Sequence, residues 1–362
     1  MTTKKKVRYA VIGAGWISQE AFLPAVEQTG NSEVAAIVSG SLDKAKQLAD
    51  FHGIKGVYPY EQFDALARSG GVDAVYIATP NSSHARYALQ AVRHRLHILV
   101  EKPLAMSLAE AEAMQAAARD AGVNLATAYR LHNDPGTLKL MALIRSGAVG
   151  DPRHFSSNFS FQIAADNHRL RKAHWGGPLQ DLGVYCLNAA RHVFGSEPVD
   201  IQALSCSDAG DPRFAEVDAG ITATLRFEGG RSATFYVGFG TDPIDVIQVL
   251  GTAGSLEMQH AYLFDKPRTI VLRRGDAVER IDVARTDNFS GMIAYFSDCI
   301  LDGTRPAVDS GEGIEDMRAL LAIEEAAVRG APVRLASSRP FTPLQPSMLR
   351  SFPPARRKLL LP

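Results

Sequence analysis

Residues Lys4 to Gly15 read KKKVRYAVIGAG, in which a charged start is followed by an apolar run and two glycines one residue apart. The run from Val7 to Ile12 predicts a buried parallel strand, and the pattern from Ile17 to Thr29 predicts a helix after the turn. Gly13 permits a tight turn. Gly15 lets backbone N–H groups approach a pyrophosphate, whose charge the positive end of the helix stabilises. The stretch therefore predicts a dinucleotide-binding turn.

Two observations qualify this fingerprint, which alone is weak evidence because many tight turns bind nothing. Ser18 occupies the place of its third glycine. The next apolar run, Val34–Val38, ends at Ser39, Gly40 and Ser41, with Lys44 close behind and no carboxylate at the strand end. An NAD site usually places Asp or Glu there, about 20 residues beyond the fingerprint. Hydroxyls and Lys44 suit a 2′-phosphate, so the sequence favours NADP; the alternative is that Lys44 is a solvated residue of the second helix.

Up to about Leu125, short apolar runs alternate with helical patterns, which is typical of βαβ units and of a parallel, doubly wound sheet. The further strand candidates are Val34–Val38, Ala74–Ala78, Ile98–Val100 and Val123–Ala126, and the helix candidates are Lys44–His52, Phe63–Ser69, His84–Arg93 and Leu108–Ala121. The fold class is therefore α/β, with a Rossmann domain expected over residues 1–126.

The period changes in the second half of the chain, after a linking helix at Gly136–Ser146. Apolar residues alternate along residues 221–227, and a Gly229-Gly230 turn leads into a second run over residues 232–239. Helical patterns return at Phe289–Leu301 and Gly313–Arg329. We expect an α+β domain over residues 127–338, built on a large, open, mostly antiparallel sheet.

Two features predict contacts with another copy of the chain. The segment over residues 339–362 is rich in proline and arginine, so we expect an extended C-terminal tail that wraps a neighbour. Phe235, Val237 and Phe239 belong to a sheet with one obviously covered face, and these apolar side chains need cover. The sequence therefore predicts a homodimer or a dimer of dimers.

Composition excludes several classes of protein. The 362 residues hold 39 basic and 39 acidic side chains, which argues against a nucleic-acid partner. The three cysteines are too few and too scattered for a disulfide framework, and no metal-binding motif stands out. No run reaches membrane-spanning length, and the basic start lacks the apolar stretch and cleavage site of a signal peptide. A reducing, cytoplasmic location is expected.

Polar residues follow the predicted parallel strands at the edge where such sheets bind ligands. These segments are Ala78-Thr79-Pro80-Asn81-Ser82-Ser83-His84, Glu101-Lys102-Pro103 and Ala128-Tyr129-Arg130-Leu131-His132, and a fourth, Gly176 to Tyr185, opens a helix in the second half. Together they resemble the glucose-fructose oxidoreductase and inositol dehydrogenase (Gfo/Idh/MocA) family, and most closely its glucose-fructose oxidoreductase branch. The likeness covers nearly the whole chain and is carried by Glu-Lys-Pro and Asp-x-Gly-x-Tyr.

This resemblance implies that Lys102 and Tyr185 carry catalysis, and the chemistry is independently sensible. Oxidation of a sugar C1 hydroxyl to a lactone needs hydride transfer to the nicotinamide and removal of the hydroxyl proton. Tyrosine is a poor base at neutral pH, but an adjacent ammonium such as Lys102 favours the phenolate. Asp181, four residues before Tyr185 on one helical face, could bond a sugar hydroxyl or orient the pair. The alternatives are purely structural: Tyr185 as a half-buried aromatic residue and Lys102 as a loop lysine before a proline.

The cofactor-binding candidates combine the fingerprint, the strand ends and residues that the resemblance places near the nicotinamide. They are Gly13, Gly15, Trp16, Ile17, Ser39, Gly40, Ser41, Lys44, Thr79, Pro80, Asn81, His84, Glu101, Lys102, Arg130 and Trp175. Arg171 is a further cleft candidate, and for His84 a structural part at the start of its helix is the better interpretation.

These observations predict an NADP-dependent oxidoreductase that acts on C1 of an aldose. Many relatives have histidine where Tyr185 stands, so inositol dehydrogenase activity is less expected. The chain shows neither the signal nor the N-terminal arm of the branch it resembles, which leaves open whether NADP stays bound between two sugars. The alternatives are a trans-dihydrodiol or xylose dehydrogenase and a non-catalytic NADP-sensing protein.

Overall fold

The computed structural model describes residues 5–336 and 339–362, which divide into two compact units. Unit 1 comprises residues 1–134, 286–313 and 345–362, and unit 2 comprises residues 135–285 and 314–344. Both units are therefore discontinuous in sequence. The boundaries expected from the sequence, at residues 126 and 338, remain predictions.

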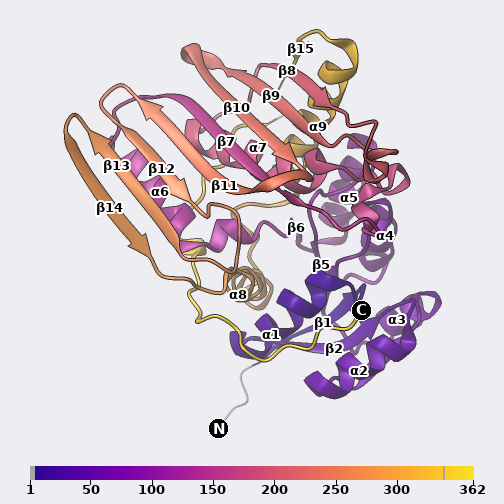
Figure 1. Cartoon of the computed structure of the whole chain (residues 1–362). Helices are drawn as coiled ribbons and strands as arrows, with labels where there is room; N and C mark the ends of the chain where they lie inside the picture. The colour runs from indigo at the N-terminus through magenta and orange to yellow at the C-terminus, as the bar shows by residue number, and fades with distance from the viewer. Residues whose placement is uncertain (1–4, 337–338) are drawn as a thin grey trace. The chain divides into compact units, whose positions relative to one another are not determined.

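Unit 1 is built on a six-stranded parallel sheet with the strand order β3-β2-β1-β4-β5-β6 (Figure 1). The strands are β1 (Val7–Ile12), β2 (Ser32–Val38), β3 (Gly56–Tyr58), β4 (Ala74–Ile77), β5 (His97–Val100) and β6 (Leu125–Thr127). The predicted parallel, doubly wound sheet is confirmed. Of these six strands, only β3 was not predicted, because its three half-buried residues form no distinct apolar pattern.

Helices connect these strands where the helical patterns predict them. A π-helical turn, η1 (Ser18–Phe22), leads into α1 (Leu23–Thr29), and the other helices are α2 (Leu42–His52), α3 (Phe63–Arg68), α4 (His84–Arg93) and α5 (Leu108–Ala121). Capping residues fix both ends of α5. The Ser107 hydroxyl accepts a hydrogen bond from the Glu110 amide at 3.2 Å, and Gly122 ends the helix with φ of +71°.

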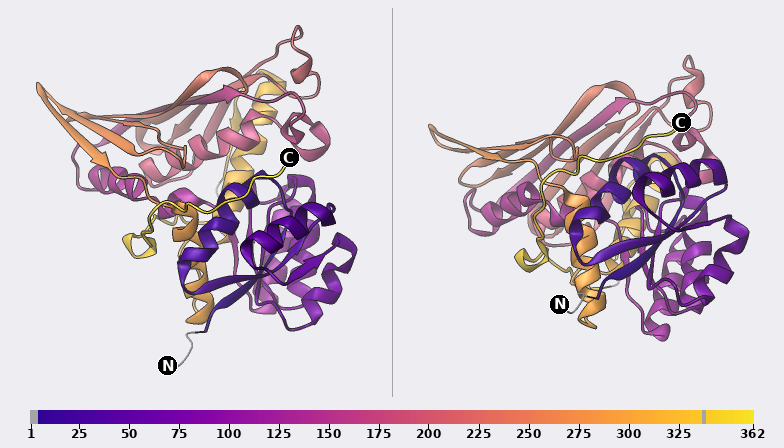
Figure 2. Two further views of the ribbon diagram at one scale, coloured as in Figure 1. Left: turned by 60° about the horizontal axis from the view of Figure 1, so that its bottom comes forward. Right: turned by 90° about the horizontal axis from the view of Figure 1, so that it is seen from below.

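Two segments return to unit 1 from the far end of the chain. Helix α8 (Asn288–Leu301) packs against the sheet, and the Ser297 hydroxyl lies 2.8 Å from the Tyr9 hydroxyl. The tail at residues 345–362 runs across η1, α1 and α2 (Figures 1 and 2). There the Leu361 amide donates to Gln19 Oε1 at 2.6 Å, and Arg357 lies over the Phe51 ring at 4.6 Å.

Residues 345–362 are extended apart from one short turn, η10 (Pro346–Met348), and contact unit 1. The physical reason is that unit 1 offers complementary partners. Lys358 pairs with Glu20, and the Ala355 amide donates to Asp287. That the tail also wraps a neighbouring copy stays a prediction.

Unit 2 contains a nine-stranded sheet with the order β14-β13-β12-β11-β7-β10-β9-β8-β15. Its strands are β7 (Pro152–Gln162), β8 (Asp200–Cys206), β9 (Gly220–Phe227), β10 (Arg231–Gly238), β11 (Gly240–Gly251), β12 (Ser255–Gln259), β13 (Arg268–Arg274), β14 (Ala277–Val283) and β15 (Val333–Arg334). All neighbouring pairs are antiparallel except β7 with β10. The expected mostly antiparallel sheet is confirmed.

Helices cover one face of this sheet. They are α6 (Pro135–Arg145), a π-helical turn η7 (Leu179–Gly183) that continues into α7 (Val184–Phe194), and α9 (Ser310–Arg329). Phe235 and Val237 point to this covered face, are almost fully buried, and lie close to Gly183. Phe239 is also fully buried within the chain. These side chains therefore do not need a partner copy for cover, because all three are buried within the chain, Phe235 and Val237 beneath η7.

The opposite face of the sheet alternates with the buried one. It presents Thr224, Gln248 and Glu257, and its large exposed apolar residues are Leu204, Ile244, Leu250 and Val278. No helix in the described parts of the chain is long and apolar enough to cross a membrane.

Candidate functional site

The candidate cofactor residues of unit 1 gather at the carboxyl edge of its parallel sheet. Each group follows one strand: Gly13–Gly15 after β1, Ser39–Ser41 after β2, Thr79–Asn81 after β4, Glu101–Lys102 after β5 and Arg130 beyond β6. Strands β1 and β4 are neighbours, so the chain's crossovers change direction between them. Ligands of open α/β sheets bind at such a switch point.

The turn after β1 has the shape that a pyrophosphate requires. Gly13 has φ of +102°, and a Cβ on it would lie 2.5 Å from the Ala78 carbonyl oxygen, so no other residue fits there. A Cβ on Gly15 would meet nothing within 4 Å, which leaves its backbone open to a ligand. Next to it, Trp16 is 55% exposed. The residues therefore fit a dinucleotide.

Two side chains hold this turn from behind. The Ser18 hydroxyl, fully buried, donates to the Gly13 carbonyl at 2.7 Å, and the Gln19 amide donates to the Ala14 carbonyl at 2.8 Å. Ser18 thus bonds the turn directly. Gln19 also accepts the Leu361 amide, which ties the C-terminal tail to the fingerprint. No local pattern indicates this link, since the two residues are far apart in the chain.

The end of β2 carries the groups proposed for a 2′-phosphate. Ser39 is buried, and its hydroxyl accepts the Ser41 amide at 3.1 Å, while Gly40 lies against the Tyr60 ring. Lys44 is half-buried in the first turn of α2. The exposed Asp43 is a carboxylate in the same turn, beyond the end of the strand.

The Lys102 loop is anchored by buried polar contacts. Tyr76 on β4 donates its hydroxyl to Glu101 Oε1 at 2.5 Å, and burial raises the pKa of the Glu101 carboxyl. Lys102 itself is half-buried, and the Lys102–Pro103 bond is cis. Phe22 stacks on Tyr76 with ring centroids 3.7 Å apart, which fixes the donor. Glu101 is thus held toward the sheet by a tyrosine that no motif singled out.

His84 lies behind the same loops. Its side chain is fully buried, with Nδ1 2.9 Å from the Pro103 carbonyl oxygen and Nε2 3.0 Å from the Thr79 carbonyl oxygen. Because a neutral imidazole carries one N–H, it donates to one carbonyl, whereas a protonated ring donates to both. Burial lowers the pKa of this ring. The side chain therefore positions the Thr79 and Lys102 loops from inside.

We expect His84→Ala to lower the free energy of unfolding by roughly 2–4 kcal/mol, because it leaves a cavity and removes a ring donor from buried carbonyls. Chemical denaturation followed by circular dichroism measures this. Arg86→Ala, at an exposed position of the same helix, is the control and should change stability by no more than about 0.5 kcal/mol. Equal effects of the two substitutions would contradict the positioning role.

In unit 2, Asp181 and Tyr185 lie where the π-helical turn η7 passes into α7. π-Helical turns are rare in proteins, and those that occur often lie at functional sites. Asp181 pairs with Arg169, whose Nε lies 3.1 Å from Oδ1. Arg171, the cleft candidate of the sequence, instead pairs with Glu216 at 2.7 Å. Sequence reasoning missed Arg169 because it lies in a single short 3-10 turn, η5 (His168–Leu170), which carries no motif.

Tyr185 packs beside two aromatic rings, Phe159 of β7 and Tyr262 of the connection between β12 and β13. Its ring centroid is 6.1 Å from that of Phe159 and 6.0 Å from that of Tyr262, and these two rings stack on each other. The Tyr262 hydroxyl lies 2.8 Å from the Ser157 hydroxyl, and burial raises the pKa of Tyr262 well above its usual value. Tyr185 itself is half-buried. Of the two unit 2 tyrosines beside Phe159, it is therefore the one accessible to a substrate.

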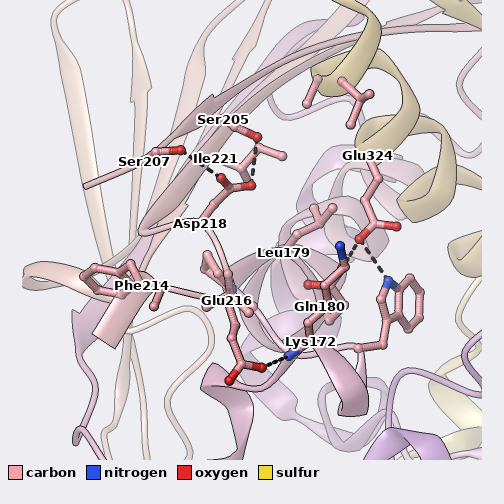
Figure 3. A pocket seen from close by; sticks show the side chains of 18 residues that line it. Lys172, Leu179, Gln180, Ser205, Ser207, Phe214, Glu216, Asp218, Ile221 and Glu324 are labelled. Atoms are coloured by element: carbon pink, nitrogen blue, oxygen red, sulfur yellow. Dashed lines mark hydrogen bonds between the residues drawn. The ribbon is translucent and has the colours of Figure 1, made fainter. Parts of the chain in front are cut away.

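The remaining candidates occupy different surroundings. Arg130 is 5% exposed, and its guanidinium lies over the Phe289 ring at 5.7 Å, so its environment is aromatic rather than solvent. Ile17 is half-buried beside the fingerprint. Trp175 belongs to unit 2, where its indole N–H donates to Glu324 at 2.9 Å. Both residues line a cavity, in which Figure 3 labels Glu324.

Family models match both halves of the chain. Residues 7–129 match the oxidoreductase family with an NAD-binding Rossmann fold, and residues 137–257 match the GFO/IDH/MocA C-terminal domain. Among curated proteins, D-xylose 1-dehydrogenase [NADP(+)] of Haloarcula marismortui is 30% identical, over 92% of this chain and 94% of the relative.

Two solved structures share the whole architecture. The aldose-aldose oxidoreductase from Caulobacter crescentus, complexed with glycerol, matches with a TM-score of 0.87 and 34% identity, over 91% of this chain and 100% of the other. A 3-ketoreductase from Actinomadura kijaniata, solved with NADP and TDP-benzene, matches with a TM-score of 0.83 and 27% identity, over 89% and 98% of the two chains.

Proposed function

The chain belongs to the GFO/IDH/MocA family of oxidoreductases, and on this premise we propose that it transfers a hydride between C1 of an aldose and NADP. The observation that carries the proposal is the combination of an open glycine turn after β1 with Lys102 after β5 and an accessible Tyr185 beside Asp181. The similarity to an NADP-dependent xylose dehydrogenase and an aldose-aldose oxidoreductase supports an aldose as substrate.

The residues that would hold the dinucleotide follow from the edge of the unit 1 sheet. Gly13 and Gly15 would lie against the pyrophosphate, since neither carries a side chain that blocks the turn. Ser39, Ser41 and Lys44 would face the 2′-phosphate. When bound, the nicotinamide supplies the hydride acceptor. The other groups of this edge, from Thr79 to Asn81 and at Glu101, Arg130 and Trp16, remain proposed cofactor contacts.

The protein's own residues handle the proton. Oxidation of the C1 hydroxyl to a lactone releases one proton, which the Tyr185 phenolate oxygen accepts in our proposal. The ammonium of Lys102 favours that phenolate electrostatically. Asp181, held by Arg169, accepts a hydrogen bond from a second hydroxyl of the sugar and so orients C1. In the reverse direction, Tyr185 returns the proton to a sugar carbonyl.

A panel of substrates separates this proposal from its alternatives. NADP reduction with D-xylose or D-glucose that exceeds the rate with naphthalene dihydrodiol supports an aldose dehydrogenase. The opposite order supports a trans-dihydrodiol dehydrogenase with the same Lys and Tyr. Tight NADP binding with no turnover of any aldose or diol would instead indicate a non-catalytic sensor, and reduction of protein-bound NADP without added cofactor would indicate a retained cofactor.

We expect Lys44→Ala to raise KM for NADP by about tenfold and to leave KM for NAD nearly unchanged, because the lost charge faces only the 2′-phosphate. Steady-state kinetics with both cofactors tests this. Lys46→Ala, an exposed lysine on the same helix, is the matched control. A Lys44 variant with unchanged preference between the two cofactors would show that this residue is merely solvated.

Assembly and location belong to the same proposal. A homodimer or a dimer of dimers stays a prediction. Its expected interface is the polar face of the unit 2 sheet, because Phe235 and Phe239 are buried within the chain. A cytoplasmic location likewise stays a prediction, consistent with the three free cysteines.

A further inference from the structure

Unit 2 contains a cavity outside the group formed by Asp181 and Tyr185. It is open to solvent on one side and has a volume of about 610 Å³, within the range of small-molecule sites. Its walls are the loop at residues 172–180, the connection between β8 and β9, and the last turns of α9 (Figure 3). Neither Asp181 nor Tyr185 lines it, whereas Gln180 of the same turn does.

Carboxylates dominate the polar wall of this cavity. Glu216, Asp218 and Glu324 line it together with one cation, Lys172. Each carboxylate already accepts two hydrogen bonds: Glu324 from Trp175 at 2.9 Å and Gln180 at 2.5 Å, Asp218 from two serines, and Glu216 from Arg171 and the Lys172 amide. A carboxylate has about four acceptor positions, so each can take further donors. The wall therefore suits a ligand rich in hydroxyl groups.

The charges also indicate what the cavity rejects. Arg171 neutralises Glu216, whereas burial raises the pKa of the Glu324 carboxyl, and the negative charge of Asp218 raises it further. A phosphate would add further negative charge to this pair. Lys172 alone opposes it. We therefore expect neutral ligands to bind better than anionic ones.

An aromatic side chain completes the cavity at a strained position. Trp175 has φ of +49°, a left-handed conformation that is costly for a bulky residue. Its bond to Glu324 and the packing of Gly176 against Arg169 hold this conformation. Aromatic faces and carboxylate acceptors together bind the apolar faces and the hydroxyls of sugar rings.

The same loop holds Asp181. The Gly177 amide donates to the Arg169 carbonyl at 2.8 Å, the Asp181 amide donates to the Gly177 carbonyl at 3.2 Å, and the Arg169 side chain pairs with Asp181. The cavity wall and the proposed substrate anchor are thus one hydrogen-bonded segment.

We propose that this cavity is a second carbohydrate site, which binds a neutral sugar unit through Glu216, Asp218, Glu324 and the indole of Trp175. The inference rests on the proposed function, because a sugar oxidoreductase gives such a site a use. The unit can come from the same substrate, as the second ring of a disaccharide, or from a separate monosaccharide.

Tryptophan fluorescence tests the site without catalysis. The chain has two tryptophans, so Trp16→Phe leaves Trp175 as the sole reporter. In the absence of cofactor, we expect D-glucose and maltose to change its emission saturably, and glucose 6-phosphate to bind at least about tenfold more weakly. Maltose at least about tenfold tighter than glucose would identify the unit as part of an extended substrate, and equal affinities would identify a separate molecule.

Variants decide whether the signal comes from this cavity. Glu324→Gln and Asp218→Asn, each in the Trp16→Phe background, should weaken sugar binding at least about tenfold. Glu325→Gln, which removes an exposed carboxylate of the same helix that pairs with Arg329, is the matched control and should leave binding unchanged. Thermal unfolding checks that each variant is folded. If Glu324→Gln does not fold, Asp218→Asn alone still tests the site.

The proposal is overturned by a silent Trp175, by unchanged affinity in both variants, or by glucose 6-phosphate binding as well as glucose. Aldose oxidation at 340 nm is measured on the unmodified protein in parallel. Turnover with a silent Trp175 rejects the second site and retains the proposed function. Sugar binding at Trp175 without turnover retains the second site and rejects the proposed function.

Discussion

Tyr185→Phe is expected to lower kcat for aldose oxidation by roughly 10³-fold, within the range that a positioned acid or base contributes. The substitution removes the proton acceptor, while the ring can keep its contacts with Phe159 and Tyr262. NADP affinity should change by less than about threefold, because the fingerprint lies in the other unit. Initial rates at 340 nm and NADP titration measure both quantities.

The control for this variant is Tyr236→Phe. Tyr236 lies on β10 of the same unit and undergoes the same chemical change. It should retain nearly full activity. If Tyr185→Phe also retained nearly full activity, Tyr185 would be a packing residue and the assignment of the acid/base would be lost.

Lys102→Met is expected to lower kcat by about 10²–10³-fold, since it removes the positive charge that favours the phenolate. Methionine keeps most of the length of the side chain without its charge. Lys139→Met, at an exposed position of α6, is the matched control. The measurement is again kcat, together with NADP affinity, which separates lost chemistry from lost binding.

The double variant shows whether the two residues act as one unit. When two groups serve the same proton transfer, removing the second costs little after the first is gone. We therefore expect the Lys102→Met and Tyr185→Phe double variant to be about as slow as the slower single variant. Losses that multiply would mean that Lys102 and Tyr185 act independently.

Much of unit 1 could be predicted because its local patterns and its fold agree. Buried parallel strands read as short apolar runs, and the Gly-x-Gly turn after β1 has a steric cause that the structure makes explicit at Ala78. Helix α8 was predicted as a helix, but its place in unit 1 was not. Its packing depends on contacts such as Ser297 with Tyr9, which join distant parts of the chain and leave no local pattern.

The candidate site shows the same division. Its motif residues, Lys102, Asp181 and Tyr185, stand out by spacing and resemblance. The groups that support them do not, because Tyr76 reads as an ordinary strand residue and Arg169 as an ordinary loop cation. The cover of the unit 2 sheet could not be predicted. Alternation of apolar residues identifies a buried face, but it does not show that η7 and α7 cover Phe235 and Val237.

Transfer of deuterium from C1-deuterated D-xylose or D-glucose to NADP tests the central claim most directly. We predict that the purified protein forms NADPH absorbing at 340 nm, that the label appears on the nicotinamide, and that the sugar product is the lactone. Label that stays on the sugar during NADP reduction would contradict oxidation at C1. No reduction of NADP by either aldose would contradict the proposed activity itself.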